Sequence, residues 1–167
     1  MGLRADLAAW DGKSADDIEH VYDRYCREPS FVADILGLAT DATLQNGATW
    51  LLKHHVDTSN SLSSDETVRF YALLPNLTHW ESRLHVLQCI PHLPVPKEHR
   101  EAVEAFLRAN MTDEVKFVRA WAYGGYWELA RQYPAYRAEA ERLCQIAMHH
   151  EAPSVKARLR QVMKKGF

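Results

Sequence analysis

The sequence has no apolar run long enough to cross a membrane, and its opening segment does not look like a secretion signal. Charges at Arg4, Asp6 and Asp11 interrupt that segment, whereas a signal peptide needs a continuous apolar stretch. Nowhere later do 18 apolar residues follow one another. We therefore expect a cytoplasmic protein that has no membrane as a partner.

Cysteines are few, and their spacing in the sequence forms no pairs. The chain has three, Cys26, Cys89 and Cys144, with no CxxC spacing among them. A disulfide framework would need an even number, and common zinc sites would show closely spaced cysteine pairs. Reduced thiols inside a core are the simpler interpretation.

The signatures of common enzymes are missing as well. The sequence contains no HExxH, GxSxG, Walker A or HxE…PCxxC pattern. His85, Cys89 and His92 do stand at i, i+4 and i+7, a spacing that can place zinc ligands on one helix face. Pro91 is expected to end that helix, and no fourth ligand is evident. We expect no metal and no cofactor, and we favour a protein that is not an enzyme without excluding one.

Helical periodicity is what the sequence has in abundance. Apolar residues recur every three or four positions, and no alternating pattern bounded by turns predicts a strand. An N-cap residue followed three positions later by an acid marks helix starts at Ser14, Ser63 and Thr78. The predicted class is all-α, with helices over roughly residues 3–12, 14–27, 30–39, 42–56, 64–75, 79–90, 97–110, 113–132, 135–149 and 154–165.

Four of these helices share a repeated pattern. Their core segments are LQNGATWLLKHH (44–55), WESRLHVLQCIP (80–91), VRAWAYGGYWEL (118–129) and VKARLRQVMKKG (155–166). The first apolar residues, Leu44, Trp80, Val118 and Val155, are 36, 38 and 37 positions apart. Self-similarity at this period predicts an array of helix pairs in which each segment is the second helix of its pair.

The pattern resembles the HEAT-like repeat family, whose second helix typically begins Val-Arg and carries small or apolar residues four, seven, eight and eleven positions later. Val118 and Arg119 match that beginning, whereas Trp80 and Glu81 depart from it. The resemblance implies a short solenoid, a right-handed α-α superhelix of the armadillo-like type. It implies one domain over residues 1–167, with a helical cap at 1–28 and helix-pair repeats at 29–57, 63–93, 96–133 and 135–166.

Gly124 and Gly125 lie inside the predicted helix 113–132, although each glycine in a helix interior costs about 1 kcal/mol relative to alanine. A loop that binds phosphate would carry its glycines before a helix start. We interpret the pair as small-residue positions that permit close packing, with Gly125 pointing into the core.

The resemblance also implies that the second helices line a concave binding surface. On a helical wheel, the residues opposite Val118 would face that surface, and the same offsets apply in the other repeats. The predicted groove residues are Thr49, Lys53, His85, Tyr123, Trp127, Arg131, Arg160 and Lys164, with Cys89 behind them. Two interpretations of Tyr123 and Trp127 stay open, since these rings would either contact a ligand or pack against flanking helices.

Charge is uneven along the chain. Residues 1–66 carry 5 Lys and Arg against 12 Asp and Glu, whereas residues 131–167 carry 8 against 3. Such asymmetry can steer a charged partner, although solvated surfaces of different sign would look the same.

The leading functional prediction is a protein-interaction or scaffold module, monomeric or weakly dimeric, because that is what such solenoids commonly do. The alternative is a nucleic-acid-binding protein similar to the HEAT-like alkylpurine glycosylases of DNA repair. Stacking and phosphate contacts would then come from Tyr123, Trp127, Arg131, Arg160 and Lys164. A third candidate is similarity to the HEAT-like lyases that handle bilin chromophores.

Overall fold

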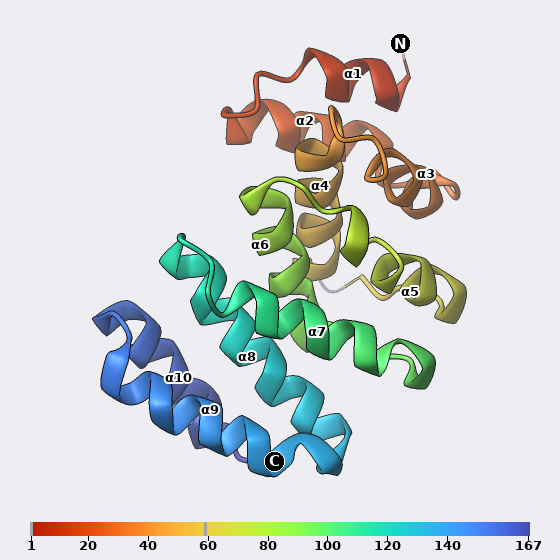
Figure 1. Ribbon diagram of the computed structural model, residues 1–167. Coiled ribbons are helices and arrows are strands. Elements are labelled where there is room, and N and C mark those ends of the chain that lie inside the picture. The colour runs from red at the N-terminus through yellow and green to blue at the C-terminus, as the bar shows by residue number, and fades with distance from the viewer. Residues whose placement is uncertain (1, 59) are drawn as a thin grey trace. The chain divides into compact units, whose positions relative to one another are not determined.

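The fold is all-α, as the sequence predicts. The computed structural model describes residues 2–58 and 60–167, and within these residues it contains ten α-helices and no strand (Figure 1). Every predicted helix has an observed counterpart whose ends lie within four residues of the prediction. No helix in the described part of the chain is long and apolar enough to span a membrane. Contacts divide the chain into two compact units, Met1–Leu93 and Pro94–Phe167, called unit 1 and unit 2 below.

Unit 1 is built from two helix pairs and a helical cap. Its helices are α1 (Leu3–Ala9), α2 (Ala15–Tyr25), α3 (Phe31–Leu38), α4 (Gln45–Asp57), α5 (Ser64–Tyr71) and α6 (Trp80–Cys89). Helix α3 packs against α4 and α5, and α4 packs against α6, so the first helices form one layer and the second helices another (Figure 1). Helices α1 and α2 pack together, and α2 covers α4.

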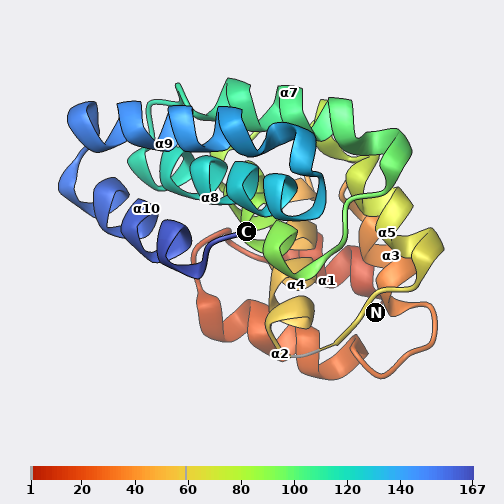
Figure 2. The ribbon, with the colours of Figure 1, turned by 90° about the horizontal axis from the view of Figure 1, so that it is seen from below.

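Unit 2 is organised around one central helix. Its helices are α7 (Arg100–Asn110), α8 (Lys116–Gln132), α9 (Arg137–His150) and α10 (Pro153–Lys165). Figure 2 shows α7 and α9 in one layer and α8 and α10 in the other. Since α7, α9 and α10 all pack against α8, buried residues occur on nearly every side of α8: Val118, Ala120, Ala122, Gly124, Gly125, Tyr126, Trp127, Leu129 and Ala130.

Two of the three predicted helix caps are confirmed. The Ser14 hydroxyl accepts a hydrogen bond from the backbone N–H of Asp17, and Ser63 forms a reciprocal capping box with Glu66. The prediction for Thr78 is wrong, because α6 begins one residue later and has no side-chain cap. The backbone N–H of Thr78 instead donates a hydrogen bond to the side chain of buried Gln45.

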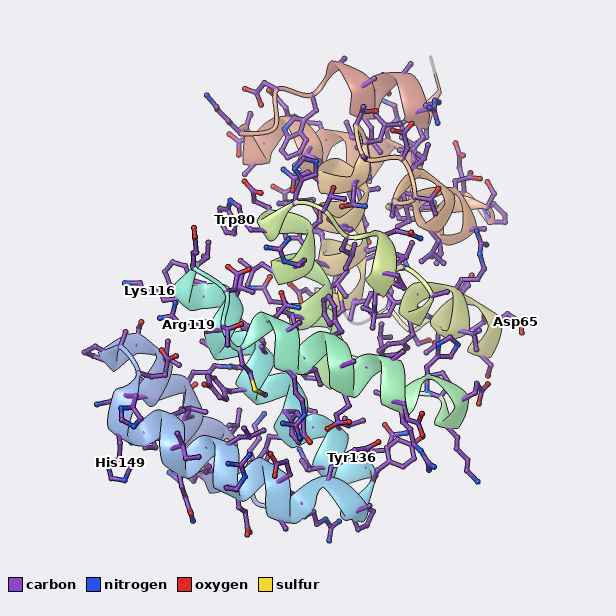
Figure 3. The ribbon with its side chains drawn as sticks, in the orientation of Figure 1. Asp65, Trp80, Lys116, Arg119, Tyr136 and His149 are labelled. Carbon is purple, nitrogen blue, oxygen red and sulfur yellow. The ribbon has the colours of Figure 1, made fainter. Side chains whose placement is uncertain are left out.

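Helix α6 also differs from the prediction in register. Trp80, predicted to be its first core residue, is 40% exposed on the first turn of α6 (Figure 3). The buried series begins instead at Ser82 and continues at Val86, Cys89 and Ile90, with the spacing that Leu44 begins in α4. The sequence pattern favoured a bulky tryptophan over a small serine as the core residue, which displaced the predicted register by two positions.

Gln45, directly after Leu44, ties two helix pairs together from a fully buried position. Its side-chain nitrogen donates to the carbonyls of Ala39 (3.0 Å) and Asn76 (2.8 Å), and its Oε1 accepts from the backbone N–H of Thr78 at 2.9 Å. The amide thereby links the loop inside its own helix pair to the loop inside the next pair.

Arg119, directly after Val118, performs the same task in unit 2. Its Nη1 donates to the carbonyl of Asp113 at 3.0 Å, in the loop before α8. Its Nε and Nη2 donate to the carboxylate of Glu151, between α9 and α10, at 2.9 and 3.1 Å. Arg119 is labelled in Figure 3 on the first turn of α8. Equivalent positions of the repeated pattern thus make equivalent connections in both units.

Candidate functional site

In unit 1, the predicted groove residues largely connect helices to one another. Thr49 of α4 is fully buried, and its hydroxyl donates to the carbonyl of Gln45 at 2.9 Å. The same oxygen lies 3.0 Å from Nδ1 of His85 on α6. Burial lowers the pKa of His85 to about 4, and burial raises the pKa of the Cys89 thiol one turn later. Buried Thr49 and half-buried His85 therefore join α4 to α6.

Lys53 remains partly accessible on α4, one turn after Thr49. Its ammonium group pairs with the carboxylate of Asp57 in the last turn of the same helix. An i,i+4 pair of this kind contributes only about 0.3–0.5 kcal/mol, so Lys53 can exchange this partner for another anion at little cost.

In unit 2, Trp127 is only 4% exposed. Its indole N–H donates to the carbonyl of Gly166 at 3.1 Å, and its ring stacks on Phe167 with centroids 4.3 Å apart. Gly166 has a φ of +67°, a conformation that glycine adopts readily and that turns the chain back toward α8. Trp127 thus lies under the C-terminal residues, whereas Tyr123 is half-buried and has a pKa raised by burial.

The three predicted basic residues of unit 2 are exposed. Arg131 lies one turn from Glu128 on α8, with a closest distance of 3.4 Å between its Nη1 and the Glu128 carboxylate. Arg160 and Lys164 are one turn apart on α10. The predicted groove residues are divided between the two units. Thr49, Lys53 and His85 belong to unit 1, and the other five residues belong to unit 2.

The sequence did not reveal the cation–π contact between Arg158 of α10 and Trp121 of α8. The Cζ atom of Arg158 lies 3.5 Å from the centroid of the Trp121 ring. The Nε atom of Arg158 is buried, and no atom in the described residues accepts a hydrogen bond from it. Burial lowers the pKa of this guanidinium group, although an arginine remains charged at neutral pH. The contact with the ring stabilises the cation but gives its N–H groups no acceptor.

Two residues of α8 complete this arrangement. Gly124 lies against the arginine, since a Cβ atom there would be in ordinary contact with Arg158 Nε at 3.5 Å and with Val162 Cγ1 at 3.6 Å. Phe117, one turn before Trp121, is 53% exposed, and the ammonium group of Lys116 lies 5.5 Å from its ring centroid. We call Phe117, Trp121 and Gly124 of α8, together with Arg158 of α10, the unit 2 seam.

A signal for the seam was present in the sequence. Phe117, Trp121, Gly124 and Glu128 stand at i, i+4, i+7 and i+11, and Arg158 follows Trp121 by 37 residues, one repeat later. The helical wheel was centred on the direction opposite Val118, where the structure buries Trp127 and leaves Arg131 exposed. The four residues lie to one side of that direction: Phe117 is exposed, Trp121 and Glu128 are half-buried and Gly124 is buried.

The chain matches no protein-family model, and neither a curated protein nor a solved structure is significantly similar to it. The HEAT-like resemblance therefore stays a prediction made from the repeated pattern. In chemical terms, the seam combines aromatic side chains with a cation whose buried Nε has no acceptor in the described part of the chain. Groups of three or more potential metal ligands are not found within residues 2–58 and 60–167.

Proposed function

We propose that this chain is a HEAT-like repeat protein that binds another protein through the second helices of its pairs. The observation that supports the proposal is the unit 2 seam. Arg158 lies there on half-buried Trp121, and its buried Nε has no acceptor among the described residues. Exposed Phe117 stands one turn before Trp121 on α8. Aromatic residues and arginine are the types most enriched at the centres of protein interfaces. We also propose a cytoplasmic location and a monomer or weak dimer.

A structural role alone gives a poorer account of this combination. Single exposed apolar side chains are common on protein surfaces and need no explanation. Phe117, however, shares a helix face with Trp121, and the charged group on Trp121 lacks an acceptor. A residue retained only for packing would not require the arginine, because an apolar side chain would cover Trp121 without a desolvated charge.

Photo-crosslinking in cells tests the proposal. A photoreactive phenylalanine analogue replaces Phe117 and, as a matched control, Ile146 of α9, which is 46% exposed but belongs to a first helix. We expect a discrete adduct with another protein at position 117 and none at 146. The same adducts from both positions, or none from either, would contradict binding through the second helices.

Nucleic-acid binding is the second candidate, and the charge of unit 2 favours it. Residues 94–167 carry 13 Lys and Arg against 9 Asp and Glu, whereas residues 1–93 carry 7 against 13. Fluorescence anisotropy with labelled duplex DNA at low and high salt separates the two candidates. Binding that weakens steeply with salt would support the nucleic-acid function, because neutralising phosphates releases counterions. Absence of binding at low salt would eliminate it.

A further inference from the structure

We propose that the unit 2 seam binds a carboxylate side chain of the partner protein, presented next to an apolar residue. Arg158 would hold the carboxylate, and Phe117 would contact the apolar neighbour. This inference rests on the proposed protein-binding function and states which chemistry the partner carries. Both residues belong to adjacent helices of one unit, α10 and α8.

The guanidinium group of Arg158 is held in place by a ring, but its Nε has no hydrogen-bond acceptor in the described residues. Its guanidinium group lies on the Trp121 ring, with 3.5 Å between Cζ and the ring centroid, so the orientation of the planar group is set before any ligand arrives. Its buried Nε finds no acceptor in the described part of the chain. This Nε is enclosed against α8, since a Cβ atom at Gly124 would lie 3.5 Å from it. An anion from outside the chain would therefore pair with the Nη groups of the same guanidinium, whose position is fixed by the ring contact.

Another arginine of unit 2, Arg119, is fully engaged with a carboxylate of its own chain. Arg119 on α8 is also partly buried, and its Nε and Nη2 donate to the carboxylate of Glu151 in a two-point contact. Such forked pairs are the strong form of arginine recognition. Arg158 has the same chemistry, and within the described residues it feels the charge of Glu128 but forms no such two-point contact. A carboxylate from a partner therefore fits the position.

In unit 1, the position equivalent to Arg158 has a hydrogen-bond partner within the chain. His85 stands three residues after Ser82, the first core residue of α6, as Arg158 stands three residues after Val155 in α10. In unit 1 this position meets Thr49 of the neighbouring second helix at 3.0 Å. Equivalent positions are thus closed by a hydrogen bond in unit 1 and left without an acceptor in unit 2.

Local charge favours a single carboxylate over a polyanion. Glu128 follows Trp121 by seven residues on the same face of α8, and its negative charge acts on Arg158. A phosphate backbone that continued along α8 would be repelled there. An acidic peptide needs to place only one carboxylate at Arg158, with an apolar residue over the exposed ring of Phe117.

A displayed library of short random peptides, sorted on the full chain, tests the inference. The sorting includes counter-selection against the Arg158→Gln variant, which keeps much of the side-chain stem but removes the charge. We expect the enriched peptides to share an Asp or Glu beside an aromatic or aliphatic residue. Their affinity should fall about tenfold or more in Arg158→Gln and stay within about twofold in Lys165→Gln, an exposed basic position on the same helix outside the predicted groove. Thermal melts confirm that both variants fold.

Four outcomes would overturn the inference: no enriched peptide, enriched peptides without an acid, equal binding to the two variants, or tighter binding of single-stranded oligo-dT. Self-association of the chain that Arg158→Gln abolishes would instead make a second copy the occupant and would also overturn it. The crosslink at position 117 keeps the two proposals apart. If that adduct persists when Arg158 is changed to Gln, the protein-binding function stands and the carboxylate inference fails.

Discussion

The two units join their second helices in opposite ways. In unit 1, α4 and α6 meet through a polar contact between buried Thr49 and half-buried His85. In unit 2, α8 and α10 meet where Arg158 lies on Trp121 with its Nε left without an acceptor. One position of the repeated pattern thus makes a hydrogen bond in unit 1 and a cation–π contact in unit 2, where we propose that it binds a ligand.

Replacing Gln45 with leucine should cause the largest loss of stability, because Gln45 holds unit 1 together. The change leaves the Ala39 and Asn76 carbonyls and the Thr78 N–H without their partner. With each unsatisfied group costing about 1–3 kcal/mol, we expect a loss of about 3 kcal/mol in the free energy of unfolding. Urea denaturation measures it.

Gln161, an exposed glutamine on α10, is the control. Its replacement by leucine should change the free energy of unfolding by less than about 0.5 kcal/mol. Equal effects of the two substitutions would show that Gln45 does not link the helix pairs.

Stability should fall in acid because of His85. Its pKa is about 4 in the folded chain, below the ordinary value of 6.5, since burial disfavours the charged form. The unfolded chain therefore binds more protons between these two pH values, and stability decreases as the pH falls through this window. The contribution lost between pH 7 and 4.5 is about 2 kcal/mol.

The His85→Gln variant cannot titrate in that range, so it isolates this contribution. We expect thermal melts to show a smaller loss of stability for the variant than for the natural chain over the same pH interval. The same loss in both proteins would place the acid sensitivity elsewhere, for example at His55, whose pKa is also lowered by burial.

Arg119 should contribute less to unit 2 than Gln45 contributes to unit 1, although the two occupy equivalent positions. Its contact with Glu151 is only partly buried, so water can replace some of what is lost. We expect Arg119→Met to cost about 1–2 kcal/mol in chemical denaturation. Arg160→Met, at an exposed position on α10, should cost almost nothing. If Arg119→Met lowered the free energy of unfolding by more than Gln45→Leu does, the expected order of the two linking residues would be wrong.

The smallest effects concern the glycines. A Cβ atom at Gly124 would make ordinary contacts at 3.5 Å or more, whereas one at Gly47 of α4 would lie 2.8 Å from Leu7 Cδ2. We expect Gly124→Ala to raise the free energy of unfolding by up to about 1 kcal/mol. Gly47→Ala should gain less or lose stability, because the buried Leu7 side chain has to move. The opposite order in thermal melts would contradict these packing contacts.

Local patterns in the sequence predicted the helices well. Apolar spacing and caps such as Ser14 and Ser63 act within a few residues of chain, so each of the ten helices lies close to its predicted range. The register of α6 failed at Trp80, because a pattern of hydrophobic residues does not recognise that Ser82 occupies the core.

The candidate site was harder to predict from the sequence, because it depends on packing between helices. Trp127 was predicted from the face of α8 opposite Val118, and the structure covers this residue by packing from elements distant in sequence, including the contact with Phe167. The seam requires α10 to place Arg158 on Trp121. A wheel drawn for one helix contains no information about which side its neighbours cover.

Titration calorimetry on paired variants tests the central claim most directly, using an acidic peptide selected on the chain. The account predicts that Arg158→Gln weakens binding about tenfold or more while the melting temperature stays nearly unchanged. It predicts the reverse for Thr49→Val, which removes the hydroxyl that meets His85: unchanged affinity with a stability loss of about 1–2 kcal/mol. Equal affinities for the natural chain and Arg158→Gln would contradict the claim that the unit 2 seam is the binding site.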